Sequence, residues 1–149
     1  MKKRKQLRLE GFKYGDGYTY HVIICTRMKN PFFANEDDAK TVCEILKENN
    51  NIINVNIIAF CVMHEHIHVL INLKEEYKKD LSEWVRGFKR FVTRALKKTD
   101  LWQKSYYDHI MRTHEKIEEI AMYIVNNPVR KGYVDNWEDY KFSYLKYKE

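Results

Sequence analysis

The chain has 149 residues, of which 44% are apolar and 32% are charged, and its net charge is +6. This size is typical of one domain, residues 1–149, and no apolar run approaches the roughly 18 residues of a membrane helix. The basic start lacks the apolar segment of a signal peptide, and three cysteines without CxxC spacing exclude a disulfide framework or zinc ribbon. We therefore expect a cytoplasmic protein. Its excess of positive charge indicates nucleic acid as a partner, or simply a basic surface.

The first half of the chain alternates strand and helix patterns. Residues 18–27, YTYHVIICTR, are β-branched and aromatic and predict a strand. Asn35 is a candidate N-cap for a helix over 36–50, because the apolar residues that follow recur with helical spacing. Residues 52–63 and 66–73 are almost continuously apolar and predict two further strands.

The second half begins with an amphipathic helix over 81–98 and a weaker strand signal over 102–112. The apolar stripe of the first helix comprises Leu81, Trp84, Val85, Phe88, Val92 and Ala95. A last helix is predicted over 113–127, with Thr113 as its N-cap and Pro128 as its end.

The order is therefore βαββαβα, which predicts an α+β sandwich with helices packed on an antiparallel or mixed sheet. Residues 1–17 form a basic N-terminal arm. Residues 135–149 form a C-terminal tail, too short for a domain, that we expect to pack on the body.

Residues 64–68, HEHIH, fit two patterns at once. His64, Glu65 and His68 match the HExxH signature of zinc proteases, which requires a helix to bring both histidines to one metal ion. The flanks are strand-like, and a run from 52 to 73 is too long for one strand, so we predict a tight turn at residues 64 and 65. His66 and His68 then begin the next strand and point to the same side, while Glu65 faces the other. A partly exposed strand with no special function is the alternative.

The last helix offers a second group of polar side chains. Its apolar stripe, Ile117, Ile120, Ala121 and Ile124, predicts the buried face. Tyr123 lies on the flank of this stripe, and Asn127 follows one turn later on the same side. The helix can therefore present a hydroxyl and an amide together, unless Tyr123 simply packs at the boundary of the core.

Taken together, these motifs resemble the HUH-type single-tyrosine transposases, and among them the REP-associated tyrosine transposases. The resemblance covers roughly residues 18–137. The matching residues are Met63, His66, Ile67, His68, Trp102, Gln103, Asp108, His109, Arg112, Tyr123, Ile124, Asn127, Pro128, Val129, Arg130, Lys131, Gly132, Tyr133 and Val134. One departure is His64, where the family has proline; it adds an imidazole beside the pair and creates the HExxH match.

The resemblance implies the ferredoxin-like, RRM-like HUH endonuclease fold and cleavage and joining of single-stranded DNA near hairpins. Tyr123 would be the nucleophile, leaving a 5′-phosphotyrosine and a free 3′-OH. His66 and His68 would hold Mg²⁺ or Mn²⁺, with Asn127 as a third ligand by analogy with the family. The oligomeric state stays open between monomer and homodimer. A non-catalytic binder of hairpin nucleic acid that keeps the fold is the main alternative.

Two basic clusters are candidate DNA contacts. On the helix 81–98 they are Arg86, Lys89, Arg90, Arg94 and Lys97, most of which form a row opposite the apolar stripe. An ordinary solvated helix face is the other interpretation. Lys3 and Arg4, in the N-terminal arm, are expected to contact a hairpin stem. Tyr106 and Tyr107 are candidates for stacking on unpaired bases, although packing is equally expected for at least one of them.

Overall fold

The computed structural model describes residues 17–111 and 114–146. The predicted order of elements is confirmed, and two short elements follow it. The strands are β1 (Tyr18–Cys25), β2 (Val55–Val62), β3 (His66–Leu73), β4 (Tyr107–Met111) and β5 (Ser143–Leu145). The helices are α1 (Glu36–Glu48), α2 (Leu81–Leu96), α3 (His114–Val125) and α4 (Asn127–Arg130). No helix in the described ranges is long and apolar enough to cross a membrane.

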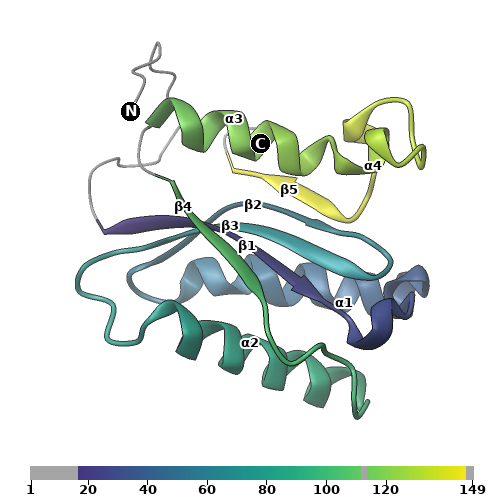
Figure 1. The fold of residues 1–149 in the computed structure, drawn as a ribbon, viewed down its shortest axis with the longest axis horizontal. Coiled ribbons are helices and arrows are strands. Elements are labelled where there is room, and N and C mark those ends of the chain that lie inside the picture. The colour runs from purple at the N-terminus through teal and green to yellow at the C-terminus, as the bar shows by residue number, and fades with distance from the viewer. Residues whose placement is uncertain (1–16, 112–113, 147–149) are drawn as a thin grey trace.

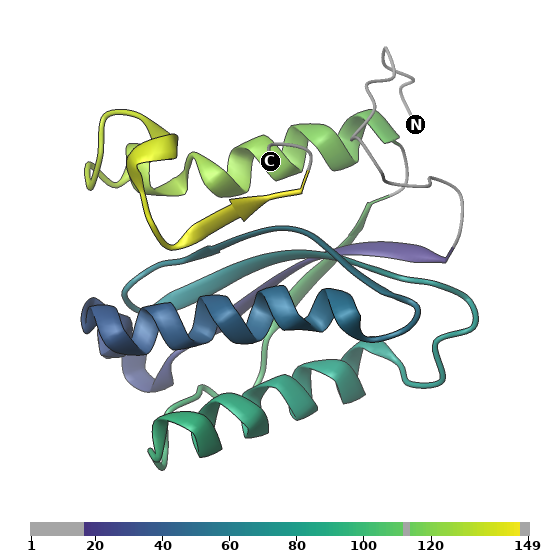
Figure 2. The same ribbon diagram turned by 180° about the vertical axis from the view of Figure 1, so that it is seen from behind.

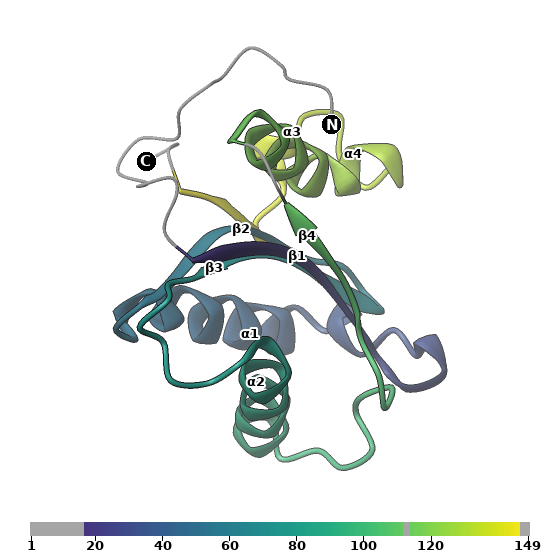
Figure 3. The same ribbon diagram turned by 60° about the vertical axis from the view of Figure 1, so that its left-hand side comes forward.

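The five strands form one sheet in the order β4-β1-β3-β2-β5, and every described pair is antiparallel, so the mixed alternative does not apply. Helices α1 and α2 cover one face of this sheet, and α3 lies over the opposite face (Figure 1). The views from behind and from the side show the same three layers (Figure 2, Figure 3). β3 and β2 lie inside the sheet, which explains why both are apolar on both faces.

The face of the sheet under α1 and α2 carries the larger apolar core. Val22 and Ile24 of β1 alternate with residues that point to the other face, and the same alternation runs along β3. Between Ile57 and Ala59 the pairing of β2 with β3 shifts by one residue. This bulge lets Ile57 and Phe60 both face α1 and α2, although they are three residues apart.

Helix α3 buries its stripe on the other face, where a second core forms. The buried members of this core are Ile58, Ala59, Cys61, Met63, Leu70, Met111, Ile117, Ala121, Ile124, Val125 and Leu145. The core joins α3 to β2, β3 and the C-terminal strand β5. All three cysteines of the chain are buried free thiols, as the sequence predicts.

Capping residues mark the starts of α1 and α2. The cap of α2 could not be predicted from its apolar stripe. The side chain of Asn35 accepts a hydrogen bond from the backbone N–H of Asp38, which confirms its predicted role as N-cap of α1. Asp80 and Glu83 form a reciprocal capping box before α2, which fixes the first turn of that helix. Ala95, predicted in the apolar stripe of α2, is exposed, and the last turn of the helix contacts the core through Leu96 instead.

Several predicted boundaries are wrong by a few residues. β1 ends at Cys25, because the chain turns into a 3₁₀ segment at Arg27. In the segment 102–112 only Tyr107–Met111 is a strand, and Trp102 makes a single bridge to Thr26. The indole N–H of Trp102 donates to the carbonyl of Lys89, so the first part of this segment is also held against α2.

Pro128 was predicted to end the last helix, and this prediction is only partly right. α3 ends at Val125, but Pro128 then lies in the first turn of α4. Proline is tolerated there because a first-turn N–H has no partner within the helix. The cap predicted at Thr113 lies outside the described residues.

The C-terminal tail joins the sheet, which the sequence does not predict in this form. β5 pairs with β2 at the edge of the sheet. The hydroxyl of Tyr140 donates a 2.6 Å hydrogen bond to the carbonyl of Val62, and burial raises the pKa of this tyrosine. The tail is therefore fixed beside the turn that precedes β3.

Candidate active site

The histidine pair lies near the start of β3, on the face of the sheet that α3 covers. His66 and His68 alternate with Ile67 and Val69, which enter the core under α1 and α2. The two imidazole rings are 4.9 Å apart between centroids and nearly perpendicular. His68 is buried and His66 is partly exposed. The predicted side-by-side arrangement is confirmed.

The turn predicted at His64 and Glu65 is present, and residues 64–68 are not helical. The zinc-protease hypothesis requires a helix at these residues, so the turn and strand found there contradict it. Within the described ranges, no group of three His, Cys, Asp or Glu side chains is placed to hold a metal ion. The prediction that Glu65 faces away from the histidines is wrong. Because Glu65 lies in the turn, strand alternation does not govern it, and its Oε1 is 2.7 Å from His66 Nδ1.

His21 on β1 is a member of this site that the sequence analysis missed. Its Nε2 is 2.9 Å from His68 Nδ1, and the two rings stack at 5.1 Å. His21 was visible inside a predicted strand, but its neighbours depend on how β1 pairs with β3. That pairing places Ile23 directly opposite His68 and puts His21 on the diagonal.

These contacts leave the same nitrogen of each β3 histidine facing the site. Nδ1 of His66 is bonded to Glu65 and Nδ1 of His68 to His21, so each Nε2 atom faces the site, where that of His66 lies 3.4 Å from the amide nitrogen of Asn127. Burial lowers the pKa of His68 strongly and that of His21 to about 4. Burial also lowers the pKa of His66, opposed by its hydrogen bond with Glu65. The neutral imidazole is the form that binds metal ions.

Tyr123 and Asn127 approach the histidines from the helical layer. The side-chain amide nitrogen of Asn127, which is buried, is 3.4 Å from His66 Nε2. The ring of Tyr123 stands edge-on to the rings of His21 and His68, with centroids 6.3 Å from each. About half of Tyr123 is exposed, so its hydroxyl group is accessible beside the buried stripe. The chain thus brings together residues separated by 61 positions in the case of His66 and Asn127.

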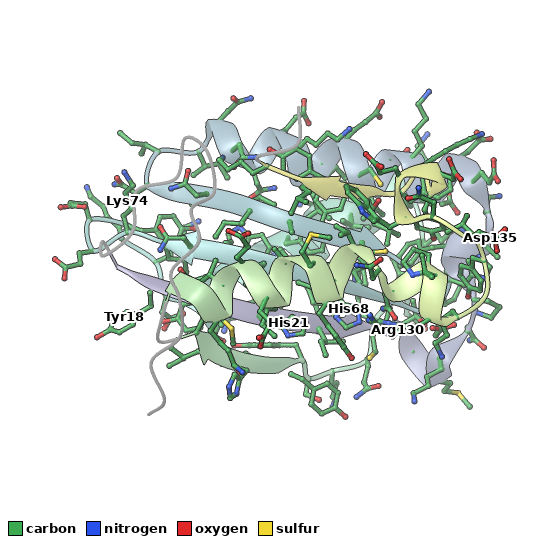
Figure 4. The ribbon with its side chains drawn as sticks, turned by 90° about the horizontal axis from the view of Figure 1, so that it is seen from above. Tyr18, His21, His68, Lys74, Arg130 and Asp135 are labelled. Carbon is green, nitrogen blue, oxygen red and sulfur yellow. The ribbon has the colours of Figure 1, made fainter. Side chains whose placement is uncertain are left out.

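Arg130 on α4 holds Tyr123 in two ways. Its guanidinium carbon lies 3.9 Å from the centroid of the Tyr123 ring, and its Nη2 donates a 2.8 Å hydrogen bond to the Tyr123 carbonyl. Figure 4 shows Arg130 with His21 and His68 along one edge of α3. Arg130 was part of the family resemblance, but only the turn between α3 and α4 folds it back onto the tyrosine.

His64 is engaged with another residue of the matched C-terminal motif. Its ring stacks on that of Tyr133 at 4.5 Å, and its Nδ1 is 3.2 Å from the Tyr133 hydroxyl. This pair closes the β2–β3 turn against the segment after α4.

The basic residues of α2 lie on the other side of the sheet from Tyr123 (Figure 1). Arg86, Arg90, Arg94 and Lys97 are exposed there. Lys89 differs, because its ammonium donates to the carbonyls of residues 103–105 at 2.9 to 3.3 Å, and burial lowers its pKa. Lys3 and Arg4 lie outside the described residues. The structure therefore does not gather the candidate DNA contacts around the tyrosine.

The donor set suits a hard or borderline divalent cation. Two neutral imidazole nitrogens and one carboxamide lie on one side of a partly open site. Cys25 and Cys61 are the cross-strand partners of His66 and His68, but burial raises the pKa of both thiols and so disfavours the thiolate form that binds metal ions. Such nitrogen and oxygen donors fit Mg²⁺ or Mn²⁺, and imidazole favours Mn²⁺. Three protein ligands would leave further positions for water and for a substrate oxygen.

Comparison with known proteins places this chain in a family. The model of the family described as "Transposase IS200 like" matches residues 15–127. The REP-associated tyrosine transposase of Escherichia coli K12 is 32% identical over 85 residues, which are 57% of this chain and 51% of that protein. A putative REP-associated tyrosine transposase of Haemophilus influenzae is 25% identical over 100 residues, 58% of this chain and 56% of that protein.

A solved structure agrees with these matches at the level of the fold. It is a REP-associated tyrosine transposase bound to a REP hairpin, with a TM-score of 0.73 and 22% identity, and the match covers 96% of this chain and 82% of that chain. The resemblance deduced from the HxH and YIxxNPV motifs is confirmed. The chain belongs to the IS200-like transposase family.

Proposed function

We propose that this protein cleaves and rejoins single-stranded DNA near hairpins through a covalent bond to Tyr123. The observation that carries the proposal is the meeting of Tyr123 and Asn127, from the helical layer, with the His66–His68 pair on one side of the sheet. The hairpin carried by the solved relative supports hairpin DNA as the substrate class. The reaction would take place in the cytoplasm, on DNA of the nucleoid, by a monomer or homodimer.

In the forward step the Tyr123 oxygen attacks the scissile phosphorus as its proton passes to solvent. The bond from phosphorus to the 3′ oxygen breaks, and that oxygen takes a proton to become a free 3′-OH. The downstream strand stays on the tyrosine through its 5′ phosphate. Attack by a 3′-OH on this phosphotyrosine reverses the exchange, so strands are joined without ATP.

The residues around Tyr123 prepare it for this step. Arg130 fixes the ring and the backbone of Tyr123, and its remaining N–H groups can donate to a phosphate oxygen. His66, His68 and Asn127 would hold Mg²⁺ or Mn²⁺, which polarises a phosphoryl oxygen when bound. Glu65 and His21 keep Nε2 of each β3 histidine turned toward that position. A binding-only protein has no need of this complete set.

Covalent capture tests the proposal. The protein is incubated with 3′-labelled single-stranded DNA that carries a hairpin, with Mn²⁺ or Mg²⁺, and is then run on a denaturing gel. We expect the label at the size of the protein for the wild type, and none for Tyr123→Phe, for His66→Ala or with a chelator. An adduct that persists in Tyr123→Phe would show that another residue is the nucleophile.

A further inference from the structure

Among the described residues, no helix covers the end of β4 that carries Tyr107, on the α3-side face of the sheet. α3 packs on β2, β3 and β5, while β4 lies beside it at the edge of the sheet (Figure 4). Tyr107, His109 and Met111 are the β4 residues on this face, because they pair with β1 residues that point toward α3. Met111 is buried under α3, but His109 and Tyr107 are exposed. The part of β4 that α3 covers therefore ends before His109, and Tyr107 lies in the uncovered part.

Tyr107 lies in line with the histidine pair. It is opposite Ile23 on β1, and Ile23 is opposite His68 on β3, so the three form one row across the sheet. Adjacent strands are about 4.8 Å apart, which places the Tyr107 backbone about 10 Å from that of His68. A single nucleotide can bridge such a distance between its phosphate and its base.

The neighbouring tyrosine has a different role. Tyr106 points to the opposite face and packs against the core under α1 and α2, whereas Tyr107 is 59% exposed. Only one of the two candidate aromatic rings is therefore available to a ligand.

We infer that Tyr107, with Ile23 beside it, is a stacking platform for one unpaired base of the DNA strand whose phosphate lies at Tyr123. This inference rests on the proposed function and adds to it a binding site for a single nucleotide on β4. An exposed ring on an uncovered sheet surface is how many proteins hold single strands, and stacking tolerates any base. The strand then runs from the open β4 edge, across β1, to the histidine pair.

The test is binding of a fluorescent short oligo(dT) in the presence of a chelator, so that neither metal nor cleavage contributes. We expect Tyr107→Ala to weaken binding about tenfold and Tyr107→Phe, which keeps the ring, to bind like the wild type. Tyr18→Ala is the matched control, because Tyr18 is 61% exposed but lies at the far end of β1 from His68 (Figure 4). Equal binding by Tyr107→Ala and the wild type would overturn the inference, as would an equal loss in Tyr107→Phe.

Two further readouts separate stacking from other causes. Loss of a stacked ring leaves the slope of log affinity against log salt unchanged, whereas loss of a phosphate contact reduces it by about 1. In the unaltered protein, photo-crosslinking of oligonucleotides that contain 5-iododeoxyuridine should modify Tyr107, as read by mass spectrometry. This measurement does not depend on the folding of any variant. Crosslinks confined to residues other than Tyr107 would contradict the inference that Tyr107 is a stacking platform.

The experiments can contradict the inference without contradicting the proposed function, and the reverse. If the wild type forms the phosphotyrosine adduct but Tyr107→Ala binds oligo(dT) normally, the platform is wrong and the cleavage reaction stands. If no adduct forms but Tyr107→Ala loses single-strand binding, the platform stands and the cleavage reaction is wrong.

Discussion

Each histidine of the β3 pair uses its Nδ1 atom on a neighbour inside the protein. Glu65 accepts from His66, and His21 shares a hydrogen bond with His68. Such partners fix the tautomer and the ring orientation of a metal ligand, and their loss commonly lowers metal affinity 10- to 100-fold. Neither residue was among the candidate ligands from the sequence, yet both act directly on them.

Replacement of Glu65 tests this arrangement. We expect Glu65→Ala to lower Mn²⁺ affinity by about 10- to 100-fold, measured by isothermal titration calorimetry, because His66 loses its orienting partner. Glu65→Gln keeps a neutral hydrogen-bond acceptor, so its Mn²⁺ affinity should lie between those of Glu65→Ala and the wild type. The control is Glu44→Ala, an exposed glutamate on α1 on the opposite face of the sheet. Unchanged Mn²⁺ binding in Glu65→Ala would contradict the role of Glu65.

Arg130 provides a second prediction at the scale of one residue. Arg130→Lys keeps the charge but loses the planar group that covers Tyr123. We expect the rate of adduct formation at saturating DNA to fall about 10- to 100-fold, the range for losing a hydrogen bond to a charged group of about 1.5–3 kcal/mol. DNA affinity should change much less. A loss confined to affinity would assign Arg130 to DNA binding alone.

At the scale of elements, α2 is separated from the site by the sheet. Its exposed arginines belong to a helix on the opposite face of the sheet from α3, which carries Tyr123 (Figure 3). DNA that they contact must therefore be a different part of the substrate from the scissile phosphate. They can then contribute to affinity through counterion release without contributing to the chemical step.

Arg90→Gln separates these two contributions. We expect the slope of log affinity against log salt to decrease by about 1, with the rate of adduct formation at saturating DNA unchanged. Lys47→Gln on α1 serves as the control for a simple change of net charge. If both variants keep the wild-type slope, the row on α2 is an ordinary solvated helix face.

Lys89 was grouped with this row, but its contacts indicate a structural contribution. Its ammonium joins α2 to the carbonyls of residues 103–105, the segment that leads into β4. We expect Lys89→Met to lower the free energy of unfolding by about 0.5–1.5 kcal/mol, measured by urea denaturation, because the half-buried carbonyl of Gln103 and two exposed carbonyls lose their donor. Arg90→Gln should not change the free energy of unfolding. A Lys89→Met variant of normal stability with a reduced salt slope would instead return Lys89 to the DNA-binding row.

At the scale of the whole molecule, the pKa values of the thiols reflect how deeply each cysteine is buried. Burial raises the pKa of Cys43 to about 12 and also raises those of Cys25 and Cys61. Each thiol ionises more readily in the unfolded chain, near pH 8.5. Its contribution to stability is therefore complete below that pH and is lost as the pH rises toward the folded value.

Cys43→Ala tests the effect of pH. Between about pH 9 and pH 11, the free energy of unfolding of the wild type should fall more steeply than that of Cys43→Ala, by up to about 1.4 kcal/mol per pH unit. Parallel curves for the two proteins would show that Cys43 ionises equally in the folded and unfolded states.

The sequence by itself determined what depends on neighbours along the chain. The periods of two and 3.6 residues located β3 and α2 correctly, and alternation placed His66 and His68 on one side of a strand. The same local geometry predicted Tyr123 and Asn127 on one side of a single helix, but α3 ends at Val125 and Asn127 begins α4. The segment 102–112 was less predictable, because the indole of Trp102 hydrogen-bonds to α2 and only residues 107–111 form a strand.

Only the tertiary structure decided which elements share a face. It placed α3 over the histidines and α2 behind the sheet, paired β1 with β3 so that His21 reaches His68, and left Tyr107 uncovered at the β4 edge. It also turned Glu65 toward His66 and folded Arg130 onto Tyr123. These contacts depend on strand order, register and turn geometry. Such features are set by the packing of apolar surfaces far apart in the chain, so no local period of the sequence encodes them.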